Sequence, residues 1–193
     1  MGAGSAKNRP PGALASPNRP RTARQTRICQ LPGATALAAE MGVAHQDSDH
    51  FFWLPTEPPF TTQRRQDERL ATLKAALPAD GSWVISGSLL SWGLEVAPYF
   101  DLVVFLYLDP KIRMARSIAR EGLRYGDRIA PGGDMHEAHQ KFMTWSRGYD
   151  DGSSGGRSLA THRAWLSTLT CPVLEITGTP TVEESVARVL MAS

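Results

Sequence analysis

Short apolar runs alternate with helix-length segments along most of the chain. Residues 83–86 and 102–108 read as buried strands, and the second run, Leu-Val-Val-Phe-Leu-Tyr-Leu, is unbroken. Such a run is typical of a central parallel strand that is covered on both faces. Weaker strands are predicted at 28–31, 43–46 and 173–176, which gives a set of short strands spread over the whole chain.

Helical spacing of apolar residues fills the intervals between these strands. Gly42 marks the end of the first helix, and Pro110 suits the first turn of another. Three prolines make 53–59 a loop. The predicted helices are 34–41, 64–77, 109–123, 135–149, 159–169 and a last one that starts at 179. Strands that alternate with helices predict βαβ units, and hence an α/β fold with a parallel sheet and helices on both faces.

Composition separates the first residues from the rest. Residues 1–26 are rich in Pro, Gly, Ala, Ser and Arg without periodicity, so we expect a disordered basic tail. Transit-peptide and nucleic-acid-arm functions of this tail stay open. Residues 1–39 carry six of the 21 basic residues and no acid, which leaves 15 basic against all 19 acidic residues in 40–193. A nucleic-acid-binding body is therefore not expected.

The remaining composition points to one domain over 27–193 in a reducing compartment. No apolar run approaches the roughly 18 residues that a membrane helix needs, and the chain opens without a compact apolar segment, so neither a membrane association nor a secretory signal is expected. Two cysteines without metal-ligand spacing fit a cytoplasmic protein. The expected partner is a small-molecule substrate, and the sequence leaves the oligomeric state open.

Several segments between residues 36 and 190 resemble the P-loop small-molecule kinases, in particular bacterial proteins related to adenylate kinase and shikimate kinase. The segments that carry the resemblance are 47–53, 83–88, 100–106, 124–129 and 131–136. The resemblance implies a three-layer P-loop-kinase-like fold with a parallel sheet of five strands, or four if the first is lost. It also implies a helical lid over about 113–150, and ATP and Mg²⁺ as substrate and cofactor.

One departure from that family is severe. Its phosphate-binding loop has the form G-x-x-x-x-G-K-[ST], in which backbone N–H groups and the Lys hold the phosphates. None of the four lysines here follows a glycine, and residues 27–35 read RICQLPGAT. An altered reading frame or a replaced N-terminus ending near Gly33 is one hypothesis. Without the loop, we expect Mg·ATP to bind with a dissociation constant of ~1 mM or weaker, and the chain to be an inactive version of the enzyme unless another segment holds the phosphates.

Asp47 and Asp49 follow a predicted strand at the end where ligands of open α/β sheets bind. Two such carboxylates can orient Mg²⁺-bound water or the acceptor hydroxyl in phosphoryl transfer. The alternative is a solvated turn in which Asp49 caps a helix. No metal site made by protein ligands alone is expected, and Asp47 is the residue that would contact Mg²⁺.

Four arginines share one face of the helix predicted after 109: Arg113, Arg116, Arg120 and Arg124. Arg128 follows in the next loop. The resemblance places Arg116, Arg120, Arg124 and Arg128 in a lid over the phosphates, with Arg120 as a catalytic cation. The alternative is a solvated helix face.

The acceptor side is expected to include Gly87 and Ser88, at the end of the strand 83–86. A glycine there permits close approach of a ligand. Trp53 and Trp92, with Phe60, are expected to line a pocket; a small aromatic core under the loops is the alternative.

The leading functional prediction is therefore an ATP-dependent phosphotransferase with a small-molecule acceptor. The first alternative is a non-catalytic nucleotide- or ligand-binding module, which the missing loop favours. The second is a metal-dependent hydrolase that uses Asp134 and His136, with His139 as a further candidate ligand.

Overall fold

The computed structural model describes residues 27–29, 33–79 and 81–193. The predicted basic tail over 1–26 and residues 30–32 of the expected phosphate-loop region lie outside the described residues. The strands are β1 (Arg27–Cys29), β2 (Ala44–Asp47), β3 (Trp83–Ser86), β4 (Leu102–Tyr107) and β5 (Val173–Thr177). The α-helices are α1 (Ala34–Met41), α2 (Ser48–Phe52), α3 (Gln66–Ala76), α4 (Pro110–Tyr125), α5 (His136–Arg147), α6 (Leu159–Leu166) and α7 (Val182–Ala192). Two 3-10 helices, η1 (Leu94–Tyr99) and η2 (Gly126–Ile129), complete the described elements.

The strands lie parallel in the order β2-β3-β1-β4-β5. Their pairing is uneven: β2 and β3 form four registered pairs and β4 and β5 form five, whereas β1 contributes three residues and only two pairs to β4. The parallel strands thus form two short two-strand ladders joined by a short β1, and most residues in the named elements are helical. The predicted three-layer P-loop-kinase-like fold with a parallel sheet of five or four strands is corrected accordingly.

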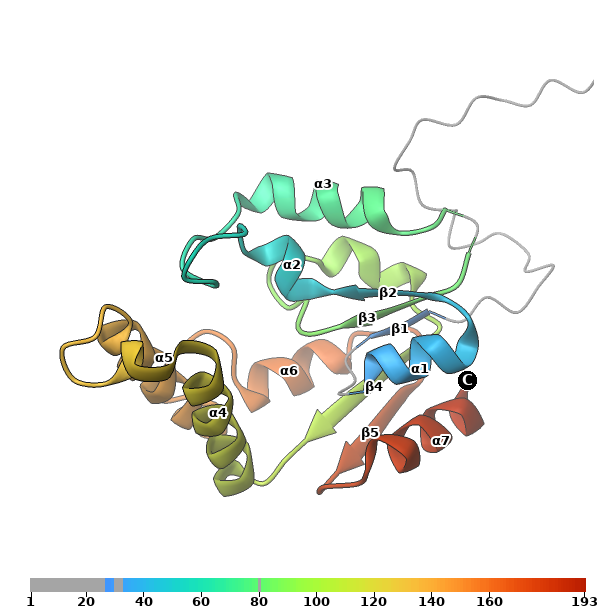
Figure 1. Ribbon diagram of the computed structural model, residues 1–193. Coiled ribbons are helices and arrows are strands. Elements are labelled where there is room, and N and C mark those ends of the chain that lie inside the picture. Colours follow the sequence, from blue (N-terminus) through green and yellow to red (C-terminus); the bar gives the residue numbers. More distant parts are fainter. Residues whose placement is uncertain (1–26, 30–32, 80) are drawn as a thin grey trace, which may run out of the picture.

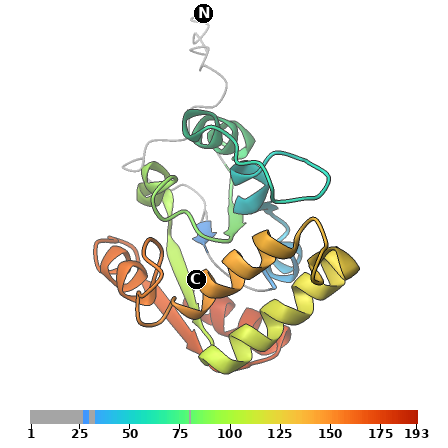
Figure 2. The ribbon, with the colours of Figure 1, turned by 90° about the vertical axis from the view of Figure 1, so that its left-hand side faces the viewer.

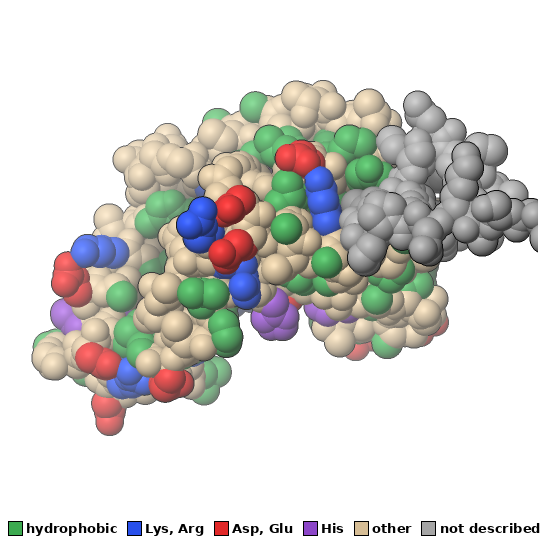
Figure 3. All heavy atoms as spheres, turned by 90° about the horizontal axis from the view of Figure 1, so that it is seen from above, with side chains coloured by type: hydrophobic (Ala, Val, Ile, Leu, Met, Phe, Trp, Pro, Cys, Tyr) green, Lys and Arg blue, Asp and Glu red, His purple; other side chains and the backbone are tan. Residues whose placement is uncertain are grey.

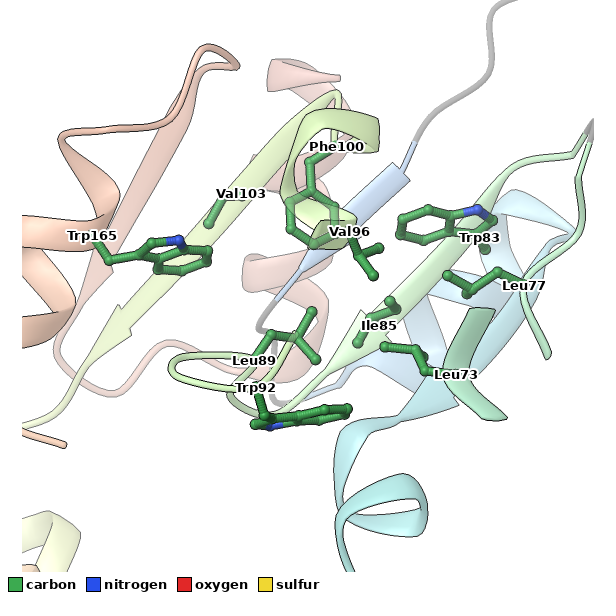
Figure 4. Packing of buried hydrophobic residues seen from close by; sticks show 10 residues of the cluster. All are labelled: Leu73, Leu77, Trp83, Ile85, Leu89, Trp92, Val96, Phe100, Val103 and Trp165. Carbon is green, nitrogen blue, oxygen red and sulfur yellow. The ribbon is translucent and has the colours of Figure 1, made fainter. Parts of the chain in front are cut away.

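Alternate residues of the strands enter two separate cores. On one side, Trp83, Ile85 and Val103 pack with Leu73 of α3 and Trp165 of α6 (Figure 4). The residues between them face the other side and pack with α1 and α7. That second core consists of Ala34, Leu37, Ala38, Val84, Leu102, Val104, Ile176 and Val189. Helices therefore cover both faces of the paired strands, as period-2 alternation of two buried faces requires.

The carboxyl ends of the strands point toward α2, α4 and α5 (Figure 1). Viewed from that side, α4 and α5 cross in front of the strands, and the loop that leads to α6 lies beside them (Figure 2). In Figure 1, α3 lies on one side of the strands and α1 and α7 on the other. This arrangement leaves the carboxyl edge of the sheet ringed by segments that are distant in sequence.

Capping side chains set several of the helix boundaries. Asp109 accepts a hydrogen bond from the backbone N–H of Lys111 at 2.9 Å. Helix α4 begins at Pro110, one residue after the predicted start, and ends at Tyr125 rather than 123. The last helix begins later than predicted, because Thr181 and Glu184 form a reciprocal capping box. Helix α3 begins at Gln66 rather than 64, α5 begins at His136 rather than 135, and η1 is an element without a sequence prediction.

Opposite charges pair on the face over α3, which Figure 3 shows from above. Arg65 lies 3.3 Å from Asp67, and Lys74 lies 2.6 Å from Glu95. This face therefore presents no patch of a single sign, which fits the near balance of charges in 40–193. Among the described residues, no helix has the length and apolar character to cross a membrane.

Candidate functional site at the carboxyl edge of the sheet

Two neighbouring strands end side by side and bring their polar termini together. Asp47, the last residue of β2, is in register with Ser86, the last residue of β3. Asp49 follows in the first turn of α2, and Ser88 follows one residue after Gly87. Because parallel strands present their carboxyl ends at the same edge, these residues share one site although they are about 40 positions apart in sequence.

Gly87 allows this approach. Its φ is +87°, in the left-handed region that side chains rarely adopt. A Cβ at this position would stand 2.0 Å from the Oγ of Ser48 and 3.7 Å from the Oδ1 of Asp47. The turn after β3 thus lies directly against the start of α2.

Asp47 has a structural task as well. Its Oδ1 accepts a hydrogen bond from the backbone N–H of Asp49 at 3.0 Å and caps α2. The alternative from the sequence has Asp49 as the cap of this helix. The capping residue is instead Asp47, two positions earlier. Asp47 caps the helix, and Asp49 is exposed in its first turn.

Burial and four charged groups shift the pKa of Asp49. Burial raises it most, and the neighbouring Asp47 carboxylate raises it further. The charges of Arg157, Arg120 and Arg124 lower it, in that order, so all three guanidinium groups stand close enough to act on this carboxylate. The net pKa is raised, which makes Asp49 a stronger base than an ordinary aspartate.

The three arginines come from two separate segments. Arg120 and Arg124 lie on α4, whereas Arg157 lies in the loop between α5 and α6. The Arg124 guanidinium stands 4.3 Å from the ring centre of Phe60, and that of Arg157 stands 4.8 Å from the ring of Trp145. Stacking on aromatic rings holds each guanidinium in place.

Asp49 and Arg157 are both reached by solvent. Burial nevertheless raises the pKa of Asp49 and lowers that of Arg157. Neighbouring protein atoms therefore act on both side chains although solvent reaches them. We use the name recess for the region around Asp49 and Arg157. A recess with two carboxylates and three guanidinium groups suits a ligand that carries both an anion and a hydroxyl.

A chain of three side chains adjoins the recess. The Ser88 hydroxyl lies 3.2 Å from Nε2 of His162, and the Tyr149 hydroxyl lies 2.8 Å from Nδ1 of the same ring. His162 is 6% exposed, and burial together with the charge of Arg157 lowers its pKa to about 4. The imidazole is therefore neutral at neutral pH.

Behind Tyr149, a brace joins α4 to the segment after α5. Arg113 pairs with Asp150, and the hydroxyl of Tyr107 donates to Oδ1 of Asp150 at 3.0 Å. The Arg113 guanidinium also stands 4.8 Å from the Tyr149 ring. Arg113 is thus used in structure rather than in the recess.

Comparison with known proteins places the chain in a family. No protein-family model matches it. It is 38% identical over 155 residues to the protein "Uncharacterized protein YqaC" of Bacillus subtilis (strain 168), a span that covers 80% of this chain and 85% of that protein. The chain belongs to the YqaC family. A solved structure of an uncharacterized protein from Eubacterium ventriosum ATCC 27560 matches over 88% of this chain and 98% of its own, with 16% identity and a TM-score of 0.42.

In this YqaC-family chain, six residues predicted from sequence come together around the recess and the turn beside it. They are Asp47, Asp49, Gly87, Ser88, Arg120 and Arg124. Arg116, which is exposed on α4, is not among the arginines whose charges shift the pKa of Asp49 most. Arg128 is held elsewhere, at 2.7 Å from Asp134 and 2.6 Å from Glu57.

The prediction for Trp92 needs correction. Trp92 is 7% exposed and belongs to the hydrophobic core, and its Nε1 donates to the backbone oxygen of Ser88 at 3.0 Å. Trp53 packs edge-on against Phe52 and Phe60. Trp92 is therefore part of the core, which is the alternative that the sequence left open. Pocket lining by the half-buried Trp53 stays a prediction.

The site also contains residues that the sequence analysis missed, namely Arg157, His162 and Tyr149. Arg157 sits in a loop rich in Gly and Ser, which offers no periodicity to read. The capped start of α6 at Ser158 was the available signal, because it fixes the loop just before the helix.

The proposed metal ligands are engaged otherwise. Both carboxylate oxygens of Asp134 accept hydrogen bonds from Arg128, and Nδ1 of His136 lies 2.9 Å from the backbone oxygen of Ile129. His139 faces Glu121 at 3.6 Å. Across the part of the chain that the structure describes, no group of three or more His, Cys, Asp or Glu side chains could hold a metal ion.

Proposed function

We propose that the protein transfers a phosphoryl group from Mg·ATP to a hydroxyl of a small-molecule acceptor. The observation that carries the proposal is the convergence of Asp47 and Asp49 with the turn after β3 at the carboxyl edge of the strands, within reach of three arginine charges. Phosphoryl transfer needs a group to orient or deprotonate the attacking hydroxyl and cations around the moving phosphate. The recess supplies both kinds of group from three separate segments.

Asp49 acts on the acceptor. Its carboxylate accepts the hydroxyl proton as the new oxygen–phosphorus bond forms and the bond to the leaving ADP breaks. A raised pKa favours this proton transfer, because basicity increases with pKa. Asp47 fixes the backbone of α2, and its second carboxylate oxygen is the group that would contact Mg²⁺.

Arg120, Arg124 and Arg157 act on the phosphate. Cations that are already in place stabilise the charge that develops on the equatorial oxygens without reorganising during the reaction. Arg124 and Arg157 are held on aromatic rings, which reduces the motion that binding must arrest. Arg120 is exposed on the same helix as Arg124.

The test is transfer of labelled γ-phosphate. The full chain is incubated with several millimolar Mg·ATP and separate acceptors: nucleoside monophosphates, nucleosides, sugars and simple alcohols. Labelled product is expected with one acceptor class, and Asp49→Asn and Arg120→Ala should each lower its rate, the latter by about 10²–10³-fold. Arg188→Ala, an exposed arginine on α7, is the matched control and should keep the rate.

The alternative of a non-catalytic binding module has one supporting observation, the lack of a G-x-x-x-x-G-K-[ST] sequence. It predicts ligand binding without transfer. Absence of labelled product with every acceptor, together with calorimetric binding of ATP or an acceptor, would replace the transferase proposal with this one.

A further inference from the structure

Ser88, His162 and Tyr149 form a hydrogen-bond chain that phosphoryl transfer as described above does not use. Ser88 is half-buried at the turn after β3, and His162 is buried on α6. Tyr149 comes from the segment after α5. Three segments far apart in sequence are thus joined through one imidazole ring, next to the recess that holds Arg157.

The Ser88–His162–Tyr149 hydrogen-bond chain contains one more hydrogen than its two links use. A neutral imidazole carries one N–H, and the two hydroxyls carry one hydrogen each. Two links, at 3.2 Å and 2.8 Å, use two of these three hydrogens. One hydroxyl hydrogen is therefore left over, either at Ser88 or at Tyr149, and the tautomer of His162 decides which.

The surroundings favour Ser88 as the end that serves a ligand. Tyr149 is held behind the chain, under the guanidinium of Arg113 and next to Asp150. Ser88 lies one residue from Gly87, whose Cα stands close to Ser48 and the Asp47 carboxylate. The Arg157 charge acts on both Asp49 and His162, so Arg157 lies within electrostatic reach of the carboxylates and of the hydrogen-bond chain.

We propose that Ser88 donates its hydroxyl hydrogen to the substrate oxyanion that Arg157 binds, and that His162 and Tyr149 are positioning residues that orient this donor. The inference rests on the proposed function and names the recognised group as a phosphate. In the bound state, Tyr149 donates to Nδ1 of His162, the Nε2–H donates to Ser88, and the Ser88 hydroxyl donates to the phosphate.

A covalent function for Ser88 fits less well. A serine nucleophile needs a base that accepts its proton. Burial and the charge of Arg157 keep the pKa of His162 at about 4, so this imidazole is a weak base. A neutral ring between two hydroxyls is better suited to orient a donor than to remove a proton.

The first experiment measures binding of inorganic phosphate to the full chain by calorimetry. Ser88→Ala is expected to weaken binding about 10-fold or more, the scale of a hydrogen bond to a charged group. Ser88→Thr keeps the hydroxyl and should retain most of the affinity. Ser167→Ala, an exposed serine on the same side of the fold as α6, is the control.

The second experiment reads the position of the His162 proton by ¹⁵N nuclear magnetic resonance. With phosphate bound, the proton is expected on Nε2 in the wild type. A structural role of Ser88 alone would not require this tautomer in the bound state. Phosphate binding by Ser88→Ala equal to that of the wild type, or a proton on Nδ1 in the bound state, would overturn the inference.

The experiments distinguish a failure of the transferase proposal from a failure of the oxyanion subsite proposal. If phosphate binds and depends on Ser88 but no acceptor is phosphorylated, the transferase proposal is wrong and the oxyanion subsite stands. If label is transferred but phosphate affinity is indifferent to Ser88→Ala, the subsite is wrong and the transferase stands. A wild-type chain that binds no phosphate overturns the subsite.

Discussion

Asp47 accepts a hydrogen bond from the backbone N–H of Asp49 at 3.0 Å, so one carboxylate fixes the short helix that presents the other. The same pair repels electrostatically, and the Asp47 charge raises the pKa of Asp49. Structure and chemistry are thus coupled in two residues, and substitutions can separate the two contributions.

Asp47→Ala should lower the free energy of unfolding by about 1 kcal/mol, because it removes the cap of α2. Asp47→Asn should cost much less, since asparagine caps helices about as well as aspartate. Chemical denaturation of both variants measures the difference. Equal losses in the two variants would mean that the charge of Asp47, rather than its cap, stabilises the protein.

Asp49→Asn should stabilise the protein at neutral pH. The pKa of Asp49 is raised in the folded state, so folding favours its protonated form. The resulting penalty is absent at a pH below the unfolded pKa of 3.8, grows as pH rises through the folded pKa, and is complete above it. The midpoint of thermal unfolding of the variant should therefore exceed that of the wild type at pH 7 and match it near pH 3. A variant less stable than the wild type at pH 7 would contradict this argument.

His162 should make the protein sensitive to mild acid. Its pKa is about 4 in the folded protein against 6.5 as the ordinary value, so the neutral ring stabilises the fold above pH 6.5. This contribution, at most about 3 kcal/mol, is lost as pH falls from 6.5 to 4. Tyr149, Ser88 and Arg157 are the polar groups that face the ring.

The measurement compares unfolding free energies between pH 7 and pH 4. His162→Gln should be less stable at pH 7 but should lose less stability on acidification than the wild type. His50→Gln, at an exposed histidine on α2, is the control and should follow the wild type. Parallel pH profiles for the wild type and His162→Gln would show that the ring does not carry the effect.

Arg157→Ala should weaken phosphate binding at least as much as Arg120→Ala. Arg157 has the largest arginine contribution at Asp49 and also acts on His162, whereas Arg120 has the second largest contribution at Asp49 and is not among the charges that act on His162. Calorimetry with inorganic phosphate measures both, with Arg188→Ala as the control. If only Arg120→Ala weakened binding, the anion would lie over α4 and not in the recess.

The sequence predicted the elements that local signals define. Gly42 and Pro110 marked helix boundaries, and the apolar run at 102–108 identified β4 almost to the residue. The strand termini also placed Asp47 and Ser88 together, because parallel strands end at one edge. The uneven pairing of β1 could not be foreseen, since strand pairing depends on register between segments that are distant in sequence.

The candidate site likewise contains residues that a local pattern predicts and residues that only the packing of distant segments brings in. Helical spacing predicts Arg120 and Arg124 correctly. Arg113 shares the predicted face, but it pairs with Asp150, which lies 37 positions later in the sequence. Arg157 and His162 reach the site through the packing of α6, which no local pattern encodes. Trp92 gave the opposite error: an aromatic residue in a loop looked available to a ligand and is buried in the core.

The turn after β3 offers the sharpest test of how closely the site is packed. Gly87 and Gly42 both have positive φ, +87° and +63°, so an alanine at either position is strained by the backbone, by roughly 1–2 kcal/mol. The two differ in what a Cβ would meet. At Gly42 nothing lies within 4 Å, whereas at Gly87 the Ser48 Oγ would be 2.0 Å away.

Gly87→Ala should therefore cost more than Gly42→Ala, by the additional ~1–3 kcal/mol that overpacking typically adds. Because the Ser48 Oγ and the Gly87 turn must separate to admit the methyl group, Ser88 should also move away from the recess, and phosphate affinity should fall. Gly42→Ala should lose stability alone and bind phosphate like the wild type. Denaturation and calorimetry on the two variants provide both readouts. Equal stability losses with unchanged phosphate binding in Gly87→Ala would show that the turn can yield without moving Ser88, and the proposed geometry of the oxyanion subsite would then be wrong.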